Sequence, residues 1–388
     1  MTKFFEKIIK LVVRFKDLTA IGVANLVASA IGGIFWILLA ALMDAEAYGE
    51  IGYFLSIASI VGVAAGLGAY NTMTVYTAKG EKIQKSLWYM VGLSGIISSV
   101  IIFFIFQNLG VSIHVLGYVI FTLIISETLG KKFYIKYSKL IITQRSLMFG
   151  LAMGLFFGIG PDGVILGIGL SFIPFVIIVY KSLKESEFSI EHLKNKKNFI
   201  ANNYVLDISK VLSGHLDKLI IAPIFGFAIL GNYYLGIQIF NLLSLLPAAV
   251  LYYTLPQDAS GKPNIKLKKV VFGASGILAV LGIFLSPILI PNFFPKFLDA
   301  ILVIQILSIA IIPKTVTFMY MSEFMGNEKI KTVVIASAIF VVVQIVLIFI
   351  LGEIYGILGL AVALVIANVA EAGYLSGIKK FSPRSRIV

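Results

Sequence analysis

Residues 201–221 read ANNYVLDISKVLSGHLDKLII and place four ionised side chains in one stretch long enough to cross a membrane. They are Asp207, Lys210, Asp217 and Lys218. The whole chain has 388 residues, of which 59% are apolar and only 13% are charged. Charge inside a bilayer is expensive and marks function by default. This stretch is therefore the first place to ask what the protein does.

Apolar runs of about 20 residues, the length that crosses a hydrocarbon core about 30 Å thick, recur on both sides of this stretch. A soluble domain would not carry so many apolar residues. The sequence therefore predicts an all-α polytopic membrane protein with twelve transmembrane helices. Their approximate positions are 18–43, 51–77, 87–106, 111–129, 140–158, 163–180, 204–225, 230–255, 270–290, 300–322, 332–352 and 355–378.

The formal net charge is +13, and the basic residues are distributed as expected for a membrane protein. Basic residues occupy every second loop and both ends of the chain, whereas the alternate loops are mostly acidic. This positive-inside pattern predicts a plasma-membrane protein with both termini in the cytoplasm. The positive charge would meet anionic membrane lipids and gives no reason to expect nucleic acid. The basic N-terminus predicts a short amphipathic helix on the inner leaflet, either an anchor or a regulatory element, with one charged face formed by Lys3, Lys7, Lys10 and Arg14.

The longest polar stretch divides the twelve spans into six and six, which predicts two six-helix bundles. The expected segments are the N-terminal helix, the first bundle, a basic cytoplasmic linker, the second bundle and a basic cytoplasmic tail, at 1–17, 18–180, 181–203, 204–378 and 379–388. Sliding the sequence by 182 positions sets Gly49 on Gly231 and Asn25 on Asp207. The bundles would then be parallel repeats with a cleft between them as the default substrate site.

The charged stretch has a polar face if it is helical. Asn203, Asp207, Lys210, Gly214 and the 217–218 pair fall within an arc of about 100°. Asp217 would lie roughly 21 Å into the membrane from Asn203 at 1.5 Å per residue. Each central Asp or Lys costs roughly 2.5–3.5 kcal/mol, which a few aliphatic residues cannot offset. The face therefore lines a cavity or packs on polar partners.

Alternatives to a substrate or ion site remain open for this stretch. Asp207 could pair with Lys210 and the face could be structural, or the first half could lie on the membrane surface. Lys314, which follows Pro313 in the tenth span, could contact substrate or pair with Asp217. Snorkelling or local pairing is the simpler interpretation of four charges near cytoplasmic helix ends, namely Glu127, Arg145, Glu323 and Glu371.

No motif of a soluble active site occurs in the chain. A nucleophile elbow, a phosphate-binding loop and a metal-spaced histidine pair are all missing, and the three histidines are scattered. The absence of cysteine excludes disulfides and thiolate metal sites. We therefore expect no enzymatic activity, no cofactor and no metal.

Three stretches carry a family resemblance: LAALMDAEAYG at 39–49, DKLII at 217–221 with GNYY at 231–234 and LP at 255–256, and YGILGLA at 355–361. In order and spacing they resemble the polysaccharide-biosynthesis flippases, the lipid-linked oligosaccharide branch of the multidrug/oligosaccharidyl-lipid/polysaccharide exporter superfamily. Ala41 stands where many members have arginine, and Lys218 stands where they usually have arginine. The last two helices of fourteen-helix members have no counterpart here.

The resemblance implies a flippase that works by alternating access and moves a polyprenyl-linked sugar to the outer leaflet. Its head group would sit in a cationic central cavity, with proton or sodium coupling. The implied diphosphate ligands are Lys210, Lys218 and Lys314, and the implied ion-coupling residues are Asp207 and Asp217. Asn25 and Asn71 are further substrate-binding candidates, with interhelical hydrogen bonds as the ordinary alternative.

Two other functions stay open. A multidrug/cation antiporter of the same superfamily would favour acidic cavity residues over lysines. A non-catalytic membrane subunit of a polysaccharide-assembly complex would need no transport site at all.

Overall fold

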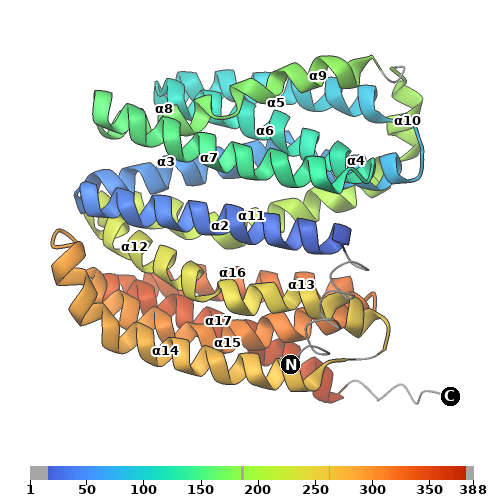
Figure 1. Cartoon of the computed structure of the whole chain (residues 1–388). Coiled ribbons are helices and arrows are strands. Elements are labelled where there is room, and N and C mark those ends of the chain that lie inside the picture. The colour runs from blue at the N-terminus through green and yellow to red at the C-terminus, as the bar shows by residue number, and fades with distance from the viewer. Residues whose placement is uncertain (1–15, 185–187, 262, 382–388) are drawn as a thin grey trace, which may run out of the picture. The chain divides into compact units, whose positions relative to one another are not determined.

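The computed structural model describes residues 16–184, 188–261 and 263–381, and every regular element in these ranges is helical (Figure 1). Contacts divide the chain into two compact units. The first holds the chain up to Phe35 together with Ile57–Ile208, and the second holds Trp36–Ser56 together with the chain from Ser209. The predicted N-terminal amphipathic helix lies almost entirely outside the described residues.

In the first unit, α6 (Leu109–Gly130) packs against α4 (Ala69–Ala78), α5 (Gln84–Phe106) and α8 (Pro161–Leu170). A further helix, α7 (Tyr134–Ile159), packs against α8. The remaining elements of the unit are η1 (Ile173–Phe175), α9 (Val176–Leu183) and α10 (Ile190–Asn195).

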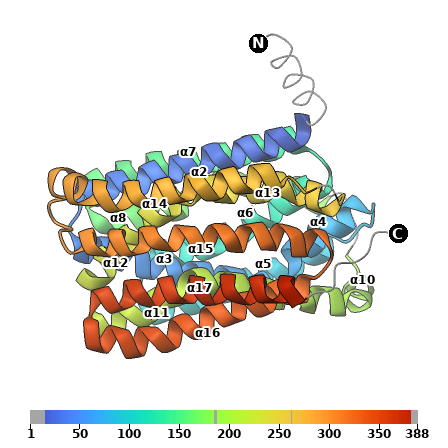
Figure 2. The same ribbon diagram turned by 90° about the horizontal axis from the view of Figure 1, so that it is seen from below.

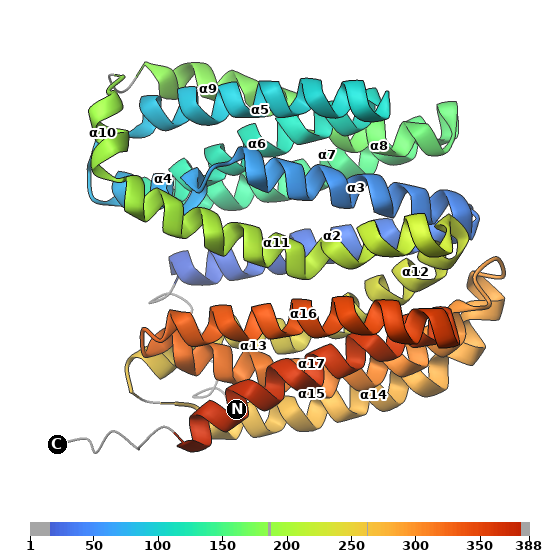
Figure 3. The ribbon, with the colours of Figure 1, turned by 180° about the vertical axis from the view of Figure 1, so that it is seen from behind.

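In the second unit, α15 (Ala300–Gly326) packs against α13 (Leu245–Ala259), α14 (Ile265–Phe293) and α17 (Ile357–Phe381). As α7 does on α8, α16 (Ile330–Tyr355) packs on α17. Figure 2 shows α14, α15, α17 and α16 running side by side in this unit, and Figure 3 shows α16 beside α17. The two packing patterns match helix for helix in chain order, which confirms the predicted parallel repeat.

The predicted twelve spans are recognisable among these helices. Ten helices are long and apolar enough to cross a membrane, and the bent pair α12 (Phe227–Leu243) and α13 makes an eleventh over the described residues. The remaining long helix, α11 (Lys197–Phe225), corresponds to the predicted span at 204–225. Its charged residues make it less apolar than the other long helices. It runs as one continuous helix.

Three helices belong to both units along their length: α2 (Lys16–Leu42), α3 (Ala45–Ala65) and α11. The units therefore divide the chain at other places than the predicted bundle boundaries of 18–180 and 204–378. The close contacts described next explain two of these differences.

The beginnings of α3 and α12 touch backbone to backbone. A Cβ built on Gly49 would lie 2.1 Å from the carbonyl oxygen of Phe227, and one built on Gly231 would lie 1.7 Å from that of Ala45. These four residues form two pairs that are each 182 positions apart, the offset of the predicted repeat. The contact is therefore reciprocal between repeat-related residues, and it assigns the turn after α2 to the second unit.

The first third of α11 is held in the first unit. Gly68, between α3 and α4, has φ +73°, and a Cβ there would lie 2.2 Å from the carbonyl oxygen of Ile200. Only glycine adopts this conformation readily and allows so close an approach. The rings of Tyr76 and Phe199 pack edge to face at 5.2 Å. The first part of the polar face of α11 therefore lies next to α4.

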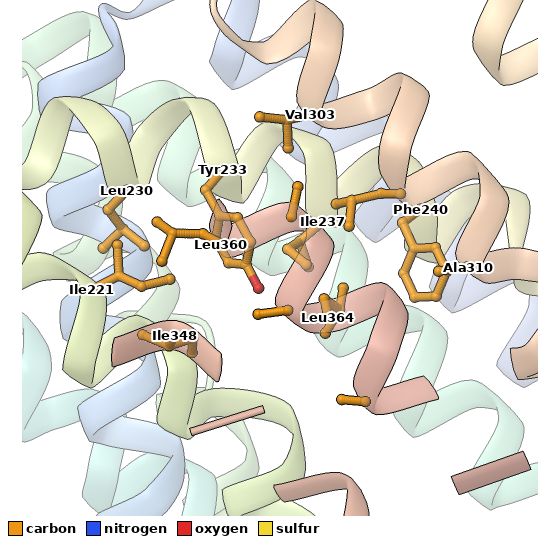
Figure 4. Packing of buried hydrophobic residues seen from close by; sticks show 14 of the residues in the cluster. Ile221, Leu230, Tyr233, Ile237, Phe240, Val303, Ala310, Ile348, Leu360 and Leu364 are labelled. Atoms are coloured by element: carbon orange, nitrogen blue, oxygen red, sulfur yellow. The ribbon is translucent and has the colours of Figure 1, made fainter. Parts of the chain in front are cut away.

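The core of the second unit forms where α11, α12, α15 and α17 meet. Figure 4 shows Ile221 and Leu230 close to Tyr233 and Leu360, all fully buried. Burying a large aliphatic side chain of this kind stabilises a protein in water by roughly 1.5–3 kcal/mol. In a bilayer the gain comes from close packing instead. Tyr233 is the one member of this group with a polar atom, and its hydroxyl leads to the candidate site.

Candidate functional site

The predicted polar residues of α11 fall into two groups, one in each unit. Asp207 belongs to the first unit, whereas Lys210, Asp217 and Lys218 belong to the second. Each group is described within its own unit.

In the first unit, Asp207 binds a predicted partner from another helix. The Nδ2 atom of Asn71, on α4, donates a hydrogen bond of 3.3 Å to Oδ1 of Asp207. Lys210, which we considered as a partner of Asp207, is exposed and makes no ion pair with any described residue. The structure therefore brings Asn71 and Asp207 together and leaves Lys210 as an available cation.

Two aromatic residues extend the group around Asp207. Tyr118 of α6 lies close enough to interact electrostatically with both Asp207 and Arg145, and Tyr70 interacts with Asp207 and Tyr118. The hydroxyl of Tyr70 donates to the carbonyl oxygen of Gly62 at 3.0 Å. We call Asn71, Asp207, Tyr118 and Arg145 the Asp207 group. It places an amide, a carboxylate, a phenol and a guanidinium within one unit.

Arg145 lies farther from the end of its helix than the sequence predicts. The prediction assumed a span beginning near residue 140, which put Arg145 close to a helix end. The helix α7 begins at Tyr134, so Arg145 lies about 16 Å along it at 1.5 Å per residue. The side chain is exposed and forms no ion pair with a described residue. The helix begins before the apolar run does, because Lys136 and Lys139 interrupt the apolar residues near the start of α7. The apolar run alone therefore does not show how far Arg145 lies from the helix end.

In the second unit, Asp217 and Lys218 pair with each other inside the protein. The ammonium of Lys218 donates to Oδ1 of Asp217 at 2.9 Å and to the carbonyl oxygen of Gly214 at 2.8 Å. The hydroxyl of Tyr233 donates to Oδ2 of Asp217 at 3.1 Å. Asp217 and Lys218 are only 5% and 3% exposed, and the ammonium lies 5.9 Å from the ring of Tyr234. Both charges are thus neutralised without solvent.

Lys314 does not pair with Asp217, which corrects one of our two alternatives for it. Its ammonium lies 3.4 Å from Oε2 of Glu371 on α17. Phe318 and Phe340 hold their ring centroids 5.4 and 5.3 Å from the same ammonium. Glu371 is nearly buried, whereas the Lys314 side chain keeps 24% exposure. Glu371 therefore pairs with a lysine of another helix.

Asn25 makes an interhelical hydrogen bond. Its Oδ1 accepts from the hydroxyl of Tyr137, on α7, at 3.2 Å. This is the ordinary use of an amide in a membrane. The predicted site residues therefore form one pair in the first unit, one pair in the second, and three separately placed side chains: Asn25, Lys210 and Lys314. Their roles in substrate or ion binding stay predictions.

Comparison with known proteins gives one clear result. No family model and no curated protein matches the sequence. Among solved structures, the lipid II flippase MurJ in an inward closed conformation superposes with a TM-score of 0.75 at 17% identity, over 94% of this chain and 88% of that one. A multidrug resistance MATE family transporter of the MOP superfamily gives 0.66 at 16% identity in its inward-facing conformation, over 92% and 95% of the two chains.

The outward-facing conformation of a MATE family transporter of the MOP superfamily gives a TM-score of 0.61 at 16% identity, over 95% of this chain and 97% of that one. The chain has the fold of the MOP transporters. This fold and its many apolar helices make it a multi-pass membrane protein. The neighbouring structures are transporters rather than enzymes. Within the described ranges, no group of three or more metal-ligating side chains is present.

Proposed function

We propose that this MOP-fold protein is a flippase for a polyprenyl-linked oligosaccharide or a related glycolipid. It moves the head group from the cytoplasmic to the outer leaflet of the plasma membrane by alternating access, with both termini in the cytoplasm. The observation that carries the proposal is the superposition on a lipid II flippase over almost the whole chain, together with cationic side chains at membrane depth. The alternating loop charges support the orientation.

The available cations would bind the diphosphate of the head group. Lys210 and Arg145 are exposed and make no ion pair with described residues. A guanidinium presents a planar fork of donors that matches phosphate oxygens, and a lysine adds a point charge. In the first unit we assign a contact with the diphosphate to Arg145, with Asn71 as a neutral donor of the same unit, and in the second unit we assign one to Lys210.

The buried lysines have a second role in the proposal. Lys218 and Lys314 are each held by a carboxylate, Asp217 and Glu371. A proton or sodium ion on either carboxylate would neutralise it and release the lysine. The released ammonium could then bind the diphosphate. This links ion binding at Asp217 to substrate binding at Lys218 and accounts for the mixed signs of charge on α11. Asp207, held by Asn71, is the corresponding acid of the first unit.

The test is transport by the purified protein in liposomes that carry a fluorescent polyprenyl-diphosphate sugar. Translocation is measured as the fraction of head groups that a membrane-impermeant quencher reaches over time. We expect Lys210→Gln and Arg145→Gln each to slow translocation about tenfold or more, since a charged hydrogen bond contributes about 1.5–3 kcal/mol. Lys139→Gln, an exposed lysine on the same helix as Arg145, is the matched control. Equal rates in all three variants and the wild type would refute the proposal.

A multidrug/cation antiporter is the second candidate, because MATE transporters share the fold. A cationic drug needs an acidic partner, yet Asp217 and Glu371 each already hold a lysine. This arrangement favours an anionic substrate. Proton-driven efflux of a cationic dye by the same liposomes, with no movement of the lipid-linked sugar, would favour the antiporter instead.

A further inference from the structure

A small cavity lies in the first unit, where α6 ends and α7 begins, and no residue of α11 lines it. It has a volume of about 260 Å³ and is lined by residues of α6, the turn after it, α7 and α9. Its polar lining residues are Glu127, Thr128, Lys131, Lys136 and Ser182. Neither the transport proposal nor the predicted site uses this cavity.

The floor of the cavity is a buried carboxylate whose oxygens are already engaged. Oε1 of Glu127 lies 2.8 Å from the ammonium of Lys131, and Oε2 accepts from the indole N–H of Trp88 at 3.0 Å. The hydroxyl of Ser182 donates to the same oxygen. A carboxylate that accepts this many bonds has little capacity for another ligand. Glu127 instead pairs with Lys131 at the cavity wall.

The remaining charge of the cavity is positive. Lys131 balances Glu127, whereas Lys136 is exposed and makes no ion pair with any residue that the structure describes. The net charge of the lining is therefore +1, from two lysines and one glutamate. Such a cavity attracts an anion, and basic pockets between helix ends are suited to phosphate head groups of lipids.

The walls of the cavity are apolar and open to the surroundings of the protein. Phe133 and Ile177 are 54% and 74% exposed, and Ile178 lines the cavity beside them. The volume is below the range of about 300–1,000 Å³ that encloses a whole drug-sized ligand. It suits a head group whose acyl chains run outward over the exposed apolar side chains.

We propose that this cavity binds the phosphate head group of an anionic phospholipid. Lys136 and Lys131 hold the phosphate, and Phe133 and Ile177 contact the first part of an acyl chain. Glu127 does not contact the phosphate and only offsets the charge of Lys131, so that Lys136 carries the unbalanced charge of the lining. The loops around the cavity are basic, so the orientation proposed above places this lipid in the cytoplasmic leaflet. The binding itself does not depend on which substrate is transported.

The experiment is native mass spectrometry of the intact protein in detergent, titrated with dioleoyl-phosphatidylglycerol and, separately, with dioleoyl-phosphatidylcholine. We expect tighter binding of the anionic lipid, and Lys136→Gln to weaken that binding about fivefold, the effect of one lysine near a charged membrane surface. Lys139→Gln, on the same helix but outside the cavity, is the matched control and should leave binding unchanged. Equal losses in the two variants would overturn the proposal.

Glu127→Gln tests the sign of the ligand charge. It keeps the volume of the side chain and its acceptor for Trp88, and it raises the net charge of the lining. We expect unchanged or tighter binding of phosphatidylglycerol. If Glu127→Gln has the thermal stability of the wild type but no longer binds phosphatidylglycerol, the cavity is a cation site and the proposal is refuted. Displacement of the lipid by millimolar inorganic phosphate would also refute it, because a soluble anion would then occupy the cavity without the apolar wall.

Discussion

Replacing Gly231 with alanine should open the contact between the beginnings of α3 and α12. The new Cβ would lie 1.7 Å from the carbonyl oxygen of Ala45 and 2.6 Å from its carbon, and both are backbone atoms that cannot rotate away. The two helix ends must separate to admit the methyl group. In the alternating-access cycle that we propose, the substitution disfavours every state in which these ends touch.

The magnitude follows from the overpacking alone. The helix propensity of alanine does not contribute, because α12 is helical in both the contacting and the separated states. Overpacking costs typically about 1–3 kcal/mol, and we take about 2 kcal/mol. This cost shifts the ratio of contacting to separated states about 30-fold, since about 1.4 kcal/mol corresponds to a factor of ten.

The assay uses the absence of cysteine in the chain. Cysteines placed at the exposed positions Glu46 and Ala228 carry two spin labels, and their distance distribution reports whether the ends touch. Gly231→Ala should populate longer distances. Gly276→Ala, where a Cβ would meet nothing within 4 Å, is the control and should keep the wild-type distribution. Wild-type distances and thermal stability in Gly231→Ala would refute the reasoning.

Three further predictions concern single side chains. Asp217→Asn should lower the free energy of unfolding by about 3–5 kcal/mol in chemical denaturation, because it leaves the buried ammonium of Lys218 without a counter-charge; a loss below about 1 kcal/mol would contradict this. Glu371→Gln should lower the free energy of unfolding by less, within about 1 kcal/mol in the same assay. The side chain of Lys314 is partly exposed, and an ion pair with an exposed partner contributes little to stability. Arg145→Lys should slow translocation less than Arg145→Gln, since it keeps the charge but loses the bidentate fork; equal rates for the two variants would exclude a phosphate contact.

The fold could be predicted because it depends on patterns along the sequence that can be recognised without knowing which residues contact each other in space. Apolar length gives the spans, loop charge gives their alternation, and the slide that set Gly49 on Gly231 found a real reciprocal contact. Helix ends were less accurate. Lysines at the start of α7 look like a loop to a hydropathy count, yet Lys136 and Lys139 lie within the helix.

The partners of the charges could not be predicted, because the geometry of one helix does not determine them. Adjacent residues on a helix point about 100° apart, so Asp217 and Lys218 do not appear as a pair on a helical wheel. The long lysine side chain turns back to the carbonyl oxygen of Gly214 and meets Asp217 there. Lys314 finds Glu371 on a helix far along the chain. Such choices depend on tertiary packing.

The first helices of the two repeats differ in charge. At the sequence offset of 182 positions α2 corresponds to α11, and both helices change from one unit to the other along their length. The described part of α2 has charges only at its start, whereas α11 carries two acid-bearing groups about 15 Å apart. One is hydrogen-bonded in the first unit and the other is neutralised in the second.

A helix whose charges cannot insert alone must be held by polar contacts in each unit that it crosses. Asp207 makes its contact through Asn71, and Asp217 makes its contact through Lys218 and Tyr233. Any ion or phosphate that changes one of these contacts therefore changes how firmly α11 is held in that unit, while α2 offers only a neutral amide at the corresponding place. In the transport that we propose, α11 is therefore the element on which the charge of a ligand would act.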